Sequence, residues 1–281
     1  MASDLWYHEG IVLKLIFAIL LVSPFMSLAH ATEDLWKGKL SFYTPVMEKV
    51  EASWPIQGLY LLNEQTEPLK IQAITTEGND YFIGVAQMMT IKAPLAQVMA
   101  FLDHYENYPQ YFDGLKKAEI LETKKEKDRN WLRIFFEQTI PIPFVPNDRN
   151  EMVYSVKTSD PSHVVYRYQF RDGNDLISND GMILLDALST RLTRYVEFDF
   201  FDAHWGIAKT FGAKKIWARS MRGLVQSDYA IKLKVENPGW DPKKVLNESK
   251  EFSESYPAED RYLNRVESKQ WFKAHGIDLS K

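Results

Sequence analysis

Hydrophobic and polar residues alternate along the middle of the chain in a series of short segments, and this pattern predicts β-strands. Alternation with a period of two places successive side chains on opposite faces of a strand. The connectors between the segments are rich in Asp, Asn, Ser, Gly and Pro, the residues of tight turns. The segments lie at 117–123, 131–139, 151–158, 163–170, 181–187 and 193–201. Strands at regular spacing joined by short turns predict an antiparallel meander.

Further strands are expected before the meander, at 56–62, 69–76 and 81–91. The segment 81–91 carries no charge, as expected for a strand that is covered on both faces. A short helix is expected after Pro94, and a second helical piece at 107–113. The residues of the first helix that we expect to face the sheet are Val98 and Leu102.

The run 203–235 has apolar residues at helical spacing and predicts one long helix. One apolar stripe comprises Ile207, Phe211, Ala218, Met221 and Val225. The basic residues expected on the flank that faces water are Lys214, Lys215, Arg219, Arg222 and Lys232. A helix of about 30 residues is about 45 Å long, so it needs a sheet to lie on.

The two ends of the chain have their own patterns. An apolar run at 15–28 is followed by Ala29-His30-Ala31, which predicts a signal peptide, 1–31, cleaved after Ala31. An uncleaved membrane anchor and a buried helix are the alternatives for this run. Residues 32–53 are interpreted as a lead-in to the fold. A Pro/Gly-rich break ends the long helix, and 236–281 is expected to be a charged, partly helical extension with a helix at 258–275.

Composition narrows the class of protein. The chain of 281 residues has a net charge of −4 and no cysteine, so it offers neither a disulfide framework nor the basic surface of a nucleic-acid-binding protein. The motifs of zinc hydrolases, serine hydrolases and nucleotide-binding proteins are absent from the sequence. We therefore expect no metal site, no cofactor and no nucleic-acid partner, and the export signal favours a periplasmic or secreted protein.

The segment 91–122 has a strand ending in an I-x-A-P turn, a helix with a spaced Val and Leu-Asp, and a Tyr-Pro step before the next strand. The residues that form this pattern are Ile91, Ala93, Pro94, Val98, Leu102, Asp103, Tyr108 and Pro109. The pattern resembles the opening of START-type lipid-transfer domains and of their relatives, the polyketide cyclase and pollen-allergen-like proteins (the SRPBCC superfamily). START-like members then have Arg-Asp after a proline-rich loop, where this chain has Arg149 followed by Asn.

The resemblance covers 54–235 and implies an α+β helix-grip fold, in which a curved antiparallel sheet wraps a long C-terminal helix. It implies a protein that binds a lipid or another hydrophobic small molecule in a cavity between sheet and helix, without catalysis. A cyclase- or aromatase-like enzyme that uses the same cavity is one alternative, with Asp103, Glu137, Tyr154 and His204 as residues to test. A structural or interaction domain without a cavity is the other.

Polar residues among the strand apolars are candidates for the cavity. One face of the strand 131–139 carries Trp131, Arg133, Phe135 and Glu137, and one face of 193–201 carries Tyr195, Glu197, Asp199 and Phe201. Each face either points into the cavity, where its charges need partners, or lies on the outer side of the sheet. The residues that we select as ligand-binding candidates are Arg133, Phe135, Glu137, Tyr154, Glu197 and Met221.

Two segments could close the cavity mouth. Trp205, Ile207 and Phe211 precede the long helix, at the position where START-like proteins close over their ligand, and they are our gate candidates. The proline-rich loop 140–146 could form the facing rim, and apolar residues at such a mouth could touch a membrane transiently. The alternative is that both segments simply cap the core.

Overall fold

A computed structural model describes Glu48 and residues 69–75, 82–126, 129–139, 147–173, 177–203 and 213–256 of the chain. The predicted features that lie outside these residues are the signal peptide, the lead-in apart from Glu48, the strand 56–62, the loop 140–146, the residues 204–212 and the helix 258–275. In the described residues, no helix is long and apolar enough to cross a membrane.

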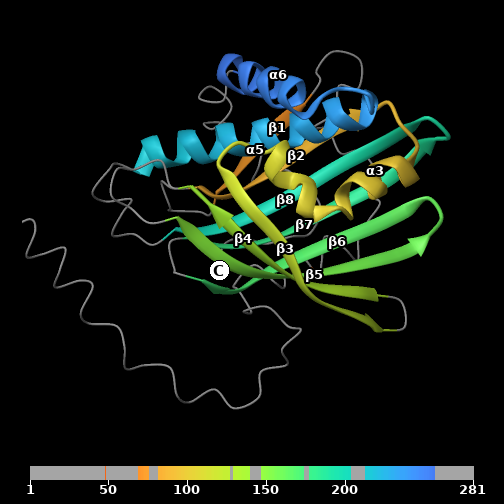
Figure 1. Ribbon diagram of the computed structural model, residues 1–281, viewed down its shortest axis with the longest axis horizontal. Coiled ribbons are helices and arrows are strands. Elements are labelled where there is room, and N and C mark those ends of the chain that lie inside the picture. Colours follow the sequence, from red (N-terminus) through yellow and green to blue (C-terminus); the bar gives the residue numbers. More distant parts are fainter. Residues whose placement is uncertain are drawn as a thin grey trace, which may run out of the picture. The chain divides into compact units, whose positions relative to one another are not determined.

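The described residues form one antiparallel sheet of eight strands, with helices before and after the meander (Figure 1). The elements are β1 (Lys70–Thr75), β2 (Phe82–Ile91), α3 (Leu95–Leu102), the 3-10 helix η1 (Tyr105–Gln110), β3 (Leu115–Glu126), β4 (Arg129–Gln138), β5 (Asp148–Asp160), β6 (His163–Gly173), β7 (Ile177–Ser189), β8 (Leu192–Ala203), α5 (Ala213–Glu236) and α6 (Pro242–Ser255). This arrangement confirms the predicted α+β helix-grip fold.

The predicted meander is confirmed as consecutive antiparallel pairs from β3 to β8. The last strand then pairs with the second, so the sheet order is β1-β2-β8-β7-β6-β5-β4-β3. Several strands extend beyond the predicted bounds, because their charged ends still pair in the ladder: Glu126 pairs with Arg129, and Asp160 with His163. The β2–β8 pairing makes β8 a central strand, with neighbours on both sides.

Both faces of the central sheet are buried. On the face toward α5, Val85 and Met89 of β2 belong to the main core cluster together with Val98 and Leu102 of α3. The expected orientation of Val98 and Leu102 is therefore confirmed. On the opposite face, Met88 of β2 is also fully buried, which confirms that β2 is covered on both faces.

Helix α5 lies along the sheet, as Figure 1 shows, and packs Met221, Val225 and Ile231 into the same core cluster. The predicted start of this helix at residue 203 is wrong, because Ala203 still belongs to β8 and pairs with Ile177 of β7. The predicted exposure of Lys232 is also wrong. Lys232 is buried, and its ammonium group donates to the Thr90 carbonyl and, at 2.6 Å, to Glu236.

Helix α6 was not located by the sequence pattern, because the Pro/Gly-rich break at 237–242 was interpreted only as the end of α5. The break is also a helix start: the Asp241 carboxylate accepts a hydrogen bond from the Lys243 amide at 2.8 Å, and Pro242 occupies the first turn. Figure 1 shows α6 beside α5. Gln226 of α5 donates to Ser249 of α6 at 2.7 Å, so α6 is bonded directly to α5.

Candidate functional site

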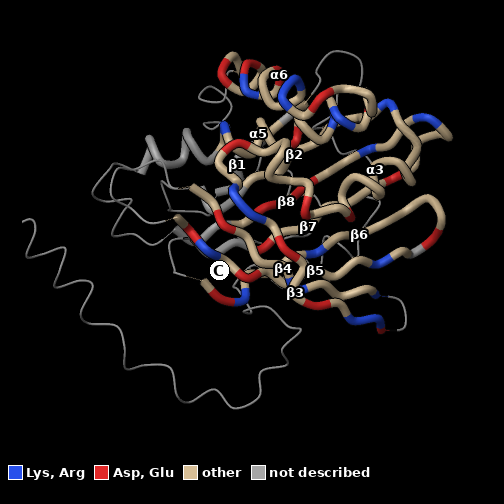
Figure 2. Tube along the Cα trace, in the orientation of Figure 1, with Lys and Arg blue, Asp and Glu red and all other residues tan. Residues whose placement is uncertain are grey.

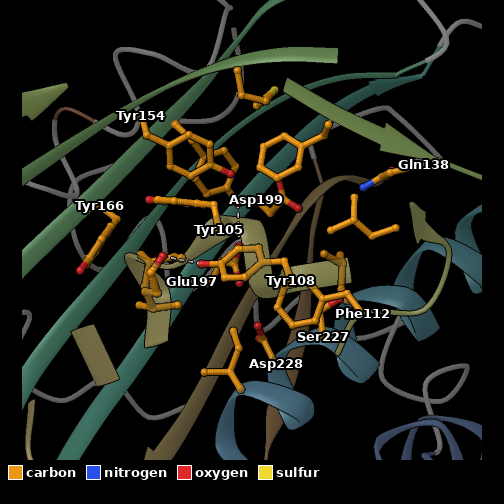
Figure 3. A pocket seen from close by; sticks show the side chains of 18 of the residues that line it. Tyr105, Tyr108, Phe112, Gln138, Tyr154, Tyr166, Glu197, Asp199, Ser227 and Asp228 are labelled. Atoms are coloured by element: carbon orange, nitrogen blue, oxygen red, sulfur yellow. Dashed lines mark hydrogen bonds between the residues drawn. The ribbon is translucent and has the colours of Figure 1, made fainter. Parts of the chain in front are cut away.

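A cavity of about 200 Å³ lies between the sheet and α5, and η1 closes one side of it (Figure 3). Its wall is built from one face of β4 to β8, from η1 and the residues around it, and from the apolar side of α5. The lining residues are Leu102, Tyr105, Tyr108, Phe112, Leu115, Phe136, Gln138, Asp148, Asn150, Met152, Tyr154, Tyr166, Tyr168, Phe170, Ile183, Tyr195, Glu197, Asp199, Leu224, Ser227, Asp228 and Ile231. Aromatic and aliphatic side chains therefore form most of the wall.

Tyrosine rings from three elements meet at the cavity. The ring centroid of Tyr105 in η1 lies 5.2 Å from that of Tyr108 and 5.0 Å from that of Tyr154 in β5. Tyr154 lies 5.3 Å from Tyr168 in β6. Burial raises the pKa of the Tyr105, Tyr154 and Tyr168 hydroxyls above the ordinary value, so these groups stay protonated and can donate hydrogen bonds.

Three carboxyl groups project into this aromatic surrounding. Glu197 and Asp199 lie two residues apart on β8 and therefore share its inner face. Asp228 lies three residues from both Val225 and Ile231, on the stripe of α5 that packs against the sheet. The sequence thus places acids on the buried faces of both a central strand and its covering helix.

Tyrosine hydroxyls provide hydrogen bonds to both carboxylate oxygens of Glu197. The Tyr168 hydroxyl donates to Glu197 Oε1 at 2.7 Å, and the Tyr195 hydroxyl lies 2.8 Å from Glu197 Oε2. The Tyr195 oxygen is also 3.2 Å from Asp228 Oδ1. A hydroxyl has a single proton, so Tyr195 cannot donate to both acids at once.

The two aspartates hold their protons more tightly than usual. Burial raises the pKa of Asp199 well above its ordinary value, and the nearby Glu197 carboxylate raises it further. Burial also raises the pKa of Asp228, again with a contribution from Glu197. The physical cause is common to both: a negative charge is costly in an apolar cavity and more so beside another negative charge.

A fourth acid lies elsewhere in the lining. Asp148, at the start of β5, is buried and accepts a hydrogen bond from Asn150 at 2.7 Å. Burial raises its pKa as well. Among the described residues, no group of His, Asp or Glu side chains has an arrangement that could hold a metal ion.

The structure resolves the two ambiguous strand faces in opposite ways. On β8, the face with Tyr195, Glu197 and Asp199 points into the cavity, and Tyr154 of β5 lines it too. The predicted positions of Glu197 and Tyr154 in the cavity wall are thus observed, and a role in ligand binding stays a prediction.

On β4, the predicted inward face is wrong, because Ile134 and Phe136 of the other face point inward instead. Arg133, Phe135 and Glu137 are absent from the lining and interact with charged partners along the neighbouring strands. Arg133 lies 3.3 Å from Glu122 and 3.8 Å from Glu151, Glu137 lies 3.6 Å from Arg149, and the Lys117 ammonium lies 5.5 Å from the Phe135 ring centroid. Figure 2 shows this mixture of positive and negative residues along β3 and β4.

The other candidates lie apart from the cavity or outside the described residues. Met221 is buried in the core cluster and does not line the cavity, so its expected place in the cavity wall is not observed. Asp103 accepts a hydrogen bond from the lining residue Tyr166 at 2.9 Å but does not itself line the cavity. His204 and the gate candidates Trp205, Ile207 and Phe211 fall outside the described residues.

Asp228 is the lining residue that sequence reasoning most clearly missed. The signal was present, since an acid at helical spacing between Val225 and Ile231 occupies a position that should be apolar. The tyrosines of the wall gave no comparable signal, because an aromatic residue on a strand or short helix is equally suited to a filled core.

Comparison with known proteins gives one match to a protein family. The sequence profile of the family described as "Polyketide cyclase / dehydrase and lipid transport" matches residues 91–251, more than half of the chain. No curated protein matched the chain.

Solved structures with similar folds share little sequence with the chain. Human STARD10 is 10% identical over 68% of this chain and 79% of its own, with a TM-score of 0.45. A START superfamily protein from Mycobacterium smegmatis is 12% identical over 56% of this chain and 99% of its own, with a TM-score of 0.41. The Zhui aromatase/cyclase from Streptomyces is 18% identical over 59% of this chain and 92% of its own, with a TM-score of 0.37.

Proposed function

Because this chain belongs to the polyketide cyclase/dehydrase and lipid transport family, we propose that it is an exported binding protein that holds a hydrophobic small molecule between the sheet and α5. The observation that carries this proposal is the cavity, whose wall is mostly aromatic and aliphatic with a few polar groups. That composition is typical of small-molecule sites.

The cavity volume limits the size of the ligand. Sites for drug-sized molecules occupy about 300–1,000 Å³, and this cavity measures about 200 Å³. The enclosed part of the ligand is therefore small, on the scale of one ring with a short substituent. A long acyl chain would have to widen the cavity or remain partly outside it.

A cavity-filling substitution tests the proposal. Leu224 lines the cavity from α5, whereas Arg222, two residues earlier, is exposed. Leu224→Trp should reduce binding of a solvatochromic hydrophobic dye at least tenfold by occupying the space, and Arg222→Trp should leave it unchanged. Dye titration measures both, with thermal denaturation to verify that each variant is folded.

Native mass spectrometry and organic extraction of the purified protein provide the second part of the test. A hydrophobic molecule should accompany the wild type and Arg222→Trp but not Leu224→Trp. Equal dye binding by a folded Leu224→Trp variant would show that hydrophobic molecules bind elsewhere, and the proposal would then be wrong.

A cyclase-like activity is the second candidate, and one observation favours it. Asp199 and Asp228 are carboxylic acids with raised pKa values in a largely apolar cavity, as is typical of groups used in acid–base catalysis. The extracted molecule discriminates the two functions. A carrier returns an added ligand with unchanged mass, whereas a cyclase or dehydrase would return a poly-carbonyl substrate as a cyclised or dehydrated product.

Export is the remaining part of the proposal, and it depends on the apolar run at 15–28 and the Ala-x-Ala site. Protein recovered from outside the cytoplasm should begin at Thr32, because Ala29 and Ala31 provide the small side chains that signal peptidase needs. N-terminal sequencing measures this directly. Exported protein that begins at Met1 would favour an uncleaved anchor.

A further inference from the structure

We infer that the ligand carries an amine and that the cavity binds it as an ammonium ion between the carboxyl groups of Asp199 and Asp228. This inference depends on the proposed function, since it specifies the chemistry of the molecule that the cavity holds. It comes from three features of the cavity: a shortage of hydrogen-bond donors, an excess of acids, and the aromatic rings that surround them.

The carboxyl groups outnumber the donors that face them. Glu197, Asp199 and Asp228 present six oxygens, and the Tyr168 and Tyr195 hydroxyls donate to Glu197. Oδ1 of Asp199 and Oδ2 of Asp228 are buried and accept no hydrogen bond from an N–H or O–H group of the described residues. Asp228 also lies within hydrogen-bond reach of Glu197, so these two acids can share a proton, which an ammonium group would replace. Asp199 and Asp228 are only 1% and 2% exposed, so bulk water does not replace the missing donor.

An unsatisfied buried acceptor destabilises the protein that carries it, so the two oxygens favour a ligand that brings its own donors. A primary ammonium group has three N–H donors and no acceptor. A hydroxyl group has one donor, and a carboxylate has none. The ammonium group therefore matches the unsatisfied oxygens best.

The charges of the cavity point the same way. Four of its described lining residues are acids, namely Asp148, Glu197, Asp199 and Asp228, and none of the described lining residues is Lys, Arg or His. Lys232 of α5 is a buried cation, but it does not line the cavity and its ammonium group is bound to Glu236 and to a backbone carbonyl. A positively charged ligand would favour release of the protons that the buried aspartates hold and would pair with the resulting carboxylates, whereas an anionic ligand would be repelled by any carboxylate in the wall.

Aromatic rings complete the site. Tyr105, Tyr154 and Tyr168 form a continuous chain of ring contacts at 5.0 and 5.3 Å, and Figure 3 shows Tyr105 and Tyr154 around the same hollow as Asp199. Ring faces attract cations, and the attraction is stronger where water is excluded. The same rings pack well against the apolar part of a small amine.

Three probes that share one ring and one chain length test the inference: 3-phenylpropylamine, 3-phenylpropanol and 3-phenylpropanoate. Calorimetric titration of the full mature protein at pH 7.5, where the amine is charged, measures their affinities. The amine should bind at least tenfold more tightly than the alcohol, and the carboxylate should bind more weakly than both.

Neutral variants then locate the charge effect. Asp199→Asn and Asp228→Asn keep the side-chain shape but cannot release a proton to form the carboxylate that pairs with the ammonium ion, so each should reduce the ratio of amine to alcohol affinity at least fivefold. Affinity for the alcohol should change little. Asp103→Asn is the matched control, since Asp103 accepts a hydrogen bond from a lining tyrosine without lining the cavity. It should keep the wild-type ratio.

The possible outcomes separate the inference from the proposed function. Equal binding of amine and alcohol to the wild type would overturn the inference and leave hydrophobic binding intact. An amine preference that persists in both Asn variants would also overturn it, because the cation would then bind elsewhere. If none of the probes binds and no hydrophobic molecule accompanies the purified protein, the proposed function itself fails. The comparison of probes on the wild type needs no variant, so it decides the question even if an Asn variant does not fold.

Discussion

Asp199→Asn is expected to stabilise the protein at neutral pH and to weaken the pH dependence of its stability. Burial and the neighbouring Glu197 raise the pKa of Asp199 above the 3.8 expected in the unfolded chain. Above about pH 4 the unfolded chain releases this proton while the folded protein retains it. The stabilising contribution is therefore complete below pH 3.8 and is lost as pH rises through the folded-state pKa.

Asn does not titrate, so the difference in unfolding free energy between variant and wild type should grow from about pH 4 upward and then level off. Each unit by which the folded-state pKa exceeds the unfolded one corresponds to about 1.4 kcal/mol, so we expect the difference in unfolding free energy to grow by at least about 1 kcal/mol between pH 4 and pH 8. Urea unfolding at pH 4, 6 and 8 measures it. The exposed Asp172→Asn is the control and should change stability by less than about 0.5 kcal/mol at each pH. An Asp199→Asn variant that is less stable than wild type at pH 8 would show that Asp199 makes a favourable interaction as a carboxylate.

For Asp199→Asn, we expect the stability of the protein to rise and its affinity for an amine to fall. If Asp199 serves a ligand, Asp199→Asn should be more stable and should bind the amine less tightly. If Asp199 only supported the fold, its replacement would destabilise the protein. Binding residues often reduce the stability of the protein that carries them, and unsatisfied buried acids are one physical form of that cost.

Phe198→Ala is expected to destabilise the protein by about 3–5 kcal/mol. Phe198 lies on the face of β8 away from the cavity, between Ala86 of β2 and Met182 of β7, and all three side chains are buried. Removing the ring leaves a cavity in the core of the covered outer face, and the surrounding strands cannot close over it without breaking their ladder.

Thermal and urea unfolding measure this loss. Leu188→Ala, at the exposed end of β7, is the control and should cost less than about 1 kcal/mol. A loss below about 1 kcal/mol for Phe198→Ala would mean that the outer face of the sheet is open to solvent in solution. The stabilising contribution of the outer face would then be small.

A comparison of β4 and β8 shows how far the alternation of residues along a strand predicts which face points inward. Both strands alternate charged and aromatic residues, and the sequence leaves the direction of each face open. β4 lies next to the edge strand, where Arg133 and Glu137 find opposite charges on β3 and β5 and keep contact with water. β8 is central, so its described acids Glu197 and Asp199 face the cavity, where the Tyr168 and Tyr195 hydroxyls bond Glu197.

The sequence by itself determined the meander, the long helix after it and the double burial of β2, because hydrophobic period and turn residues are local properties. Its resemblance to START-like proteins implied the helix-grip fold. The sequence also indicated a cavity wall that includes Tyr154 and Glu197. Only the tertiary structure decided that β2 pairs with β8, that α6 supports α5, and that Asp228 of the helix meets Glu197 of the strand. Those contacts join residues far apart in the chain, and their orientation depends on which faces water can reach once the sheet has closed around the helix.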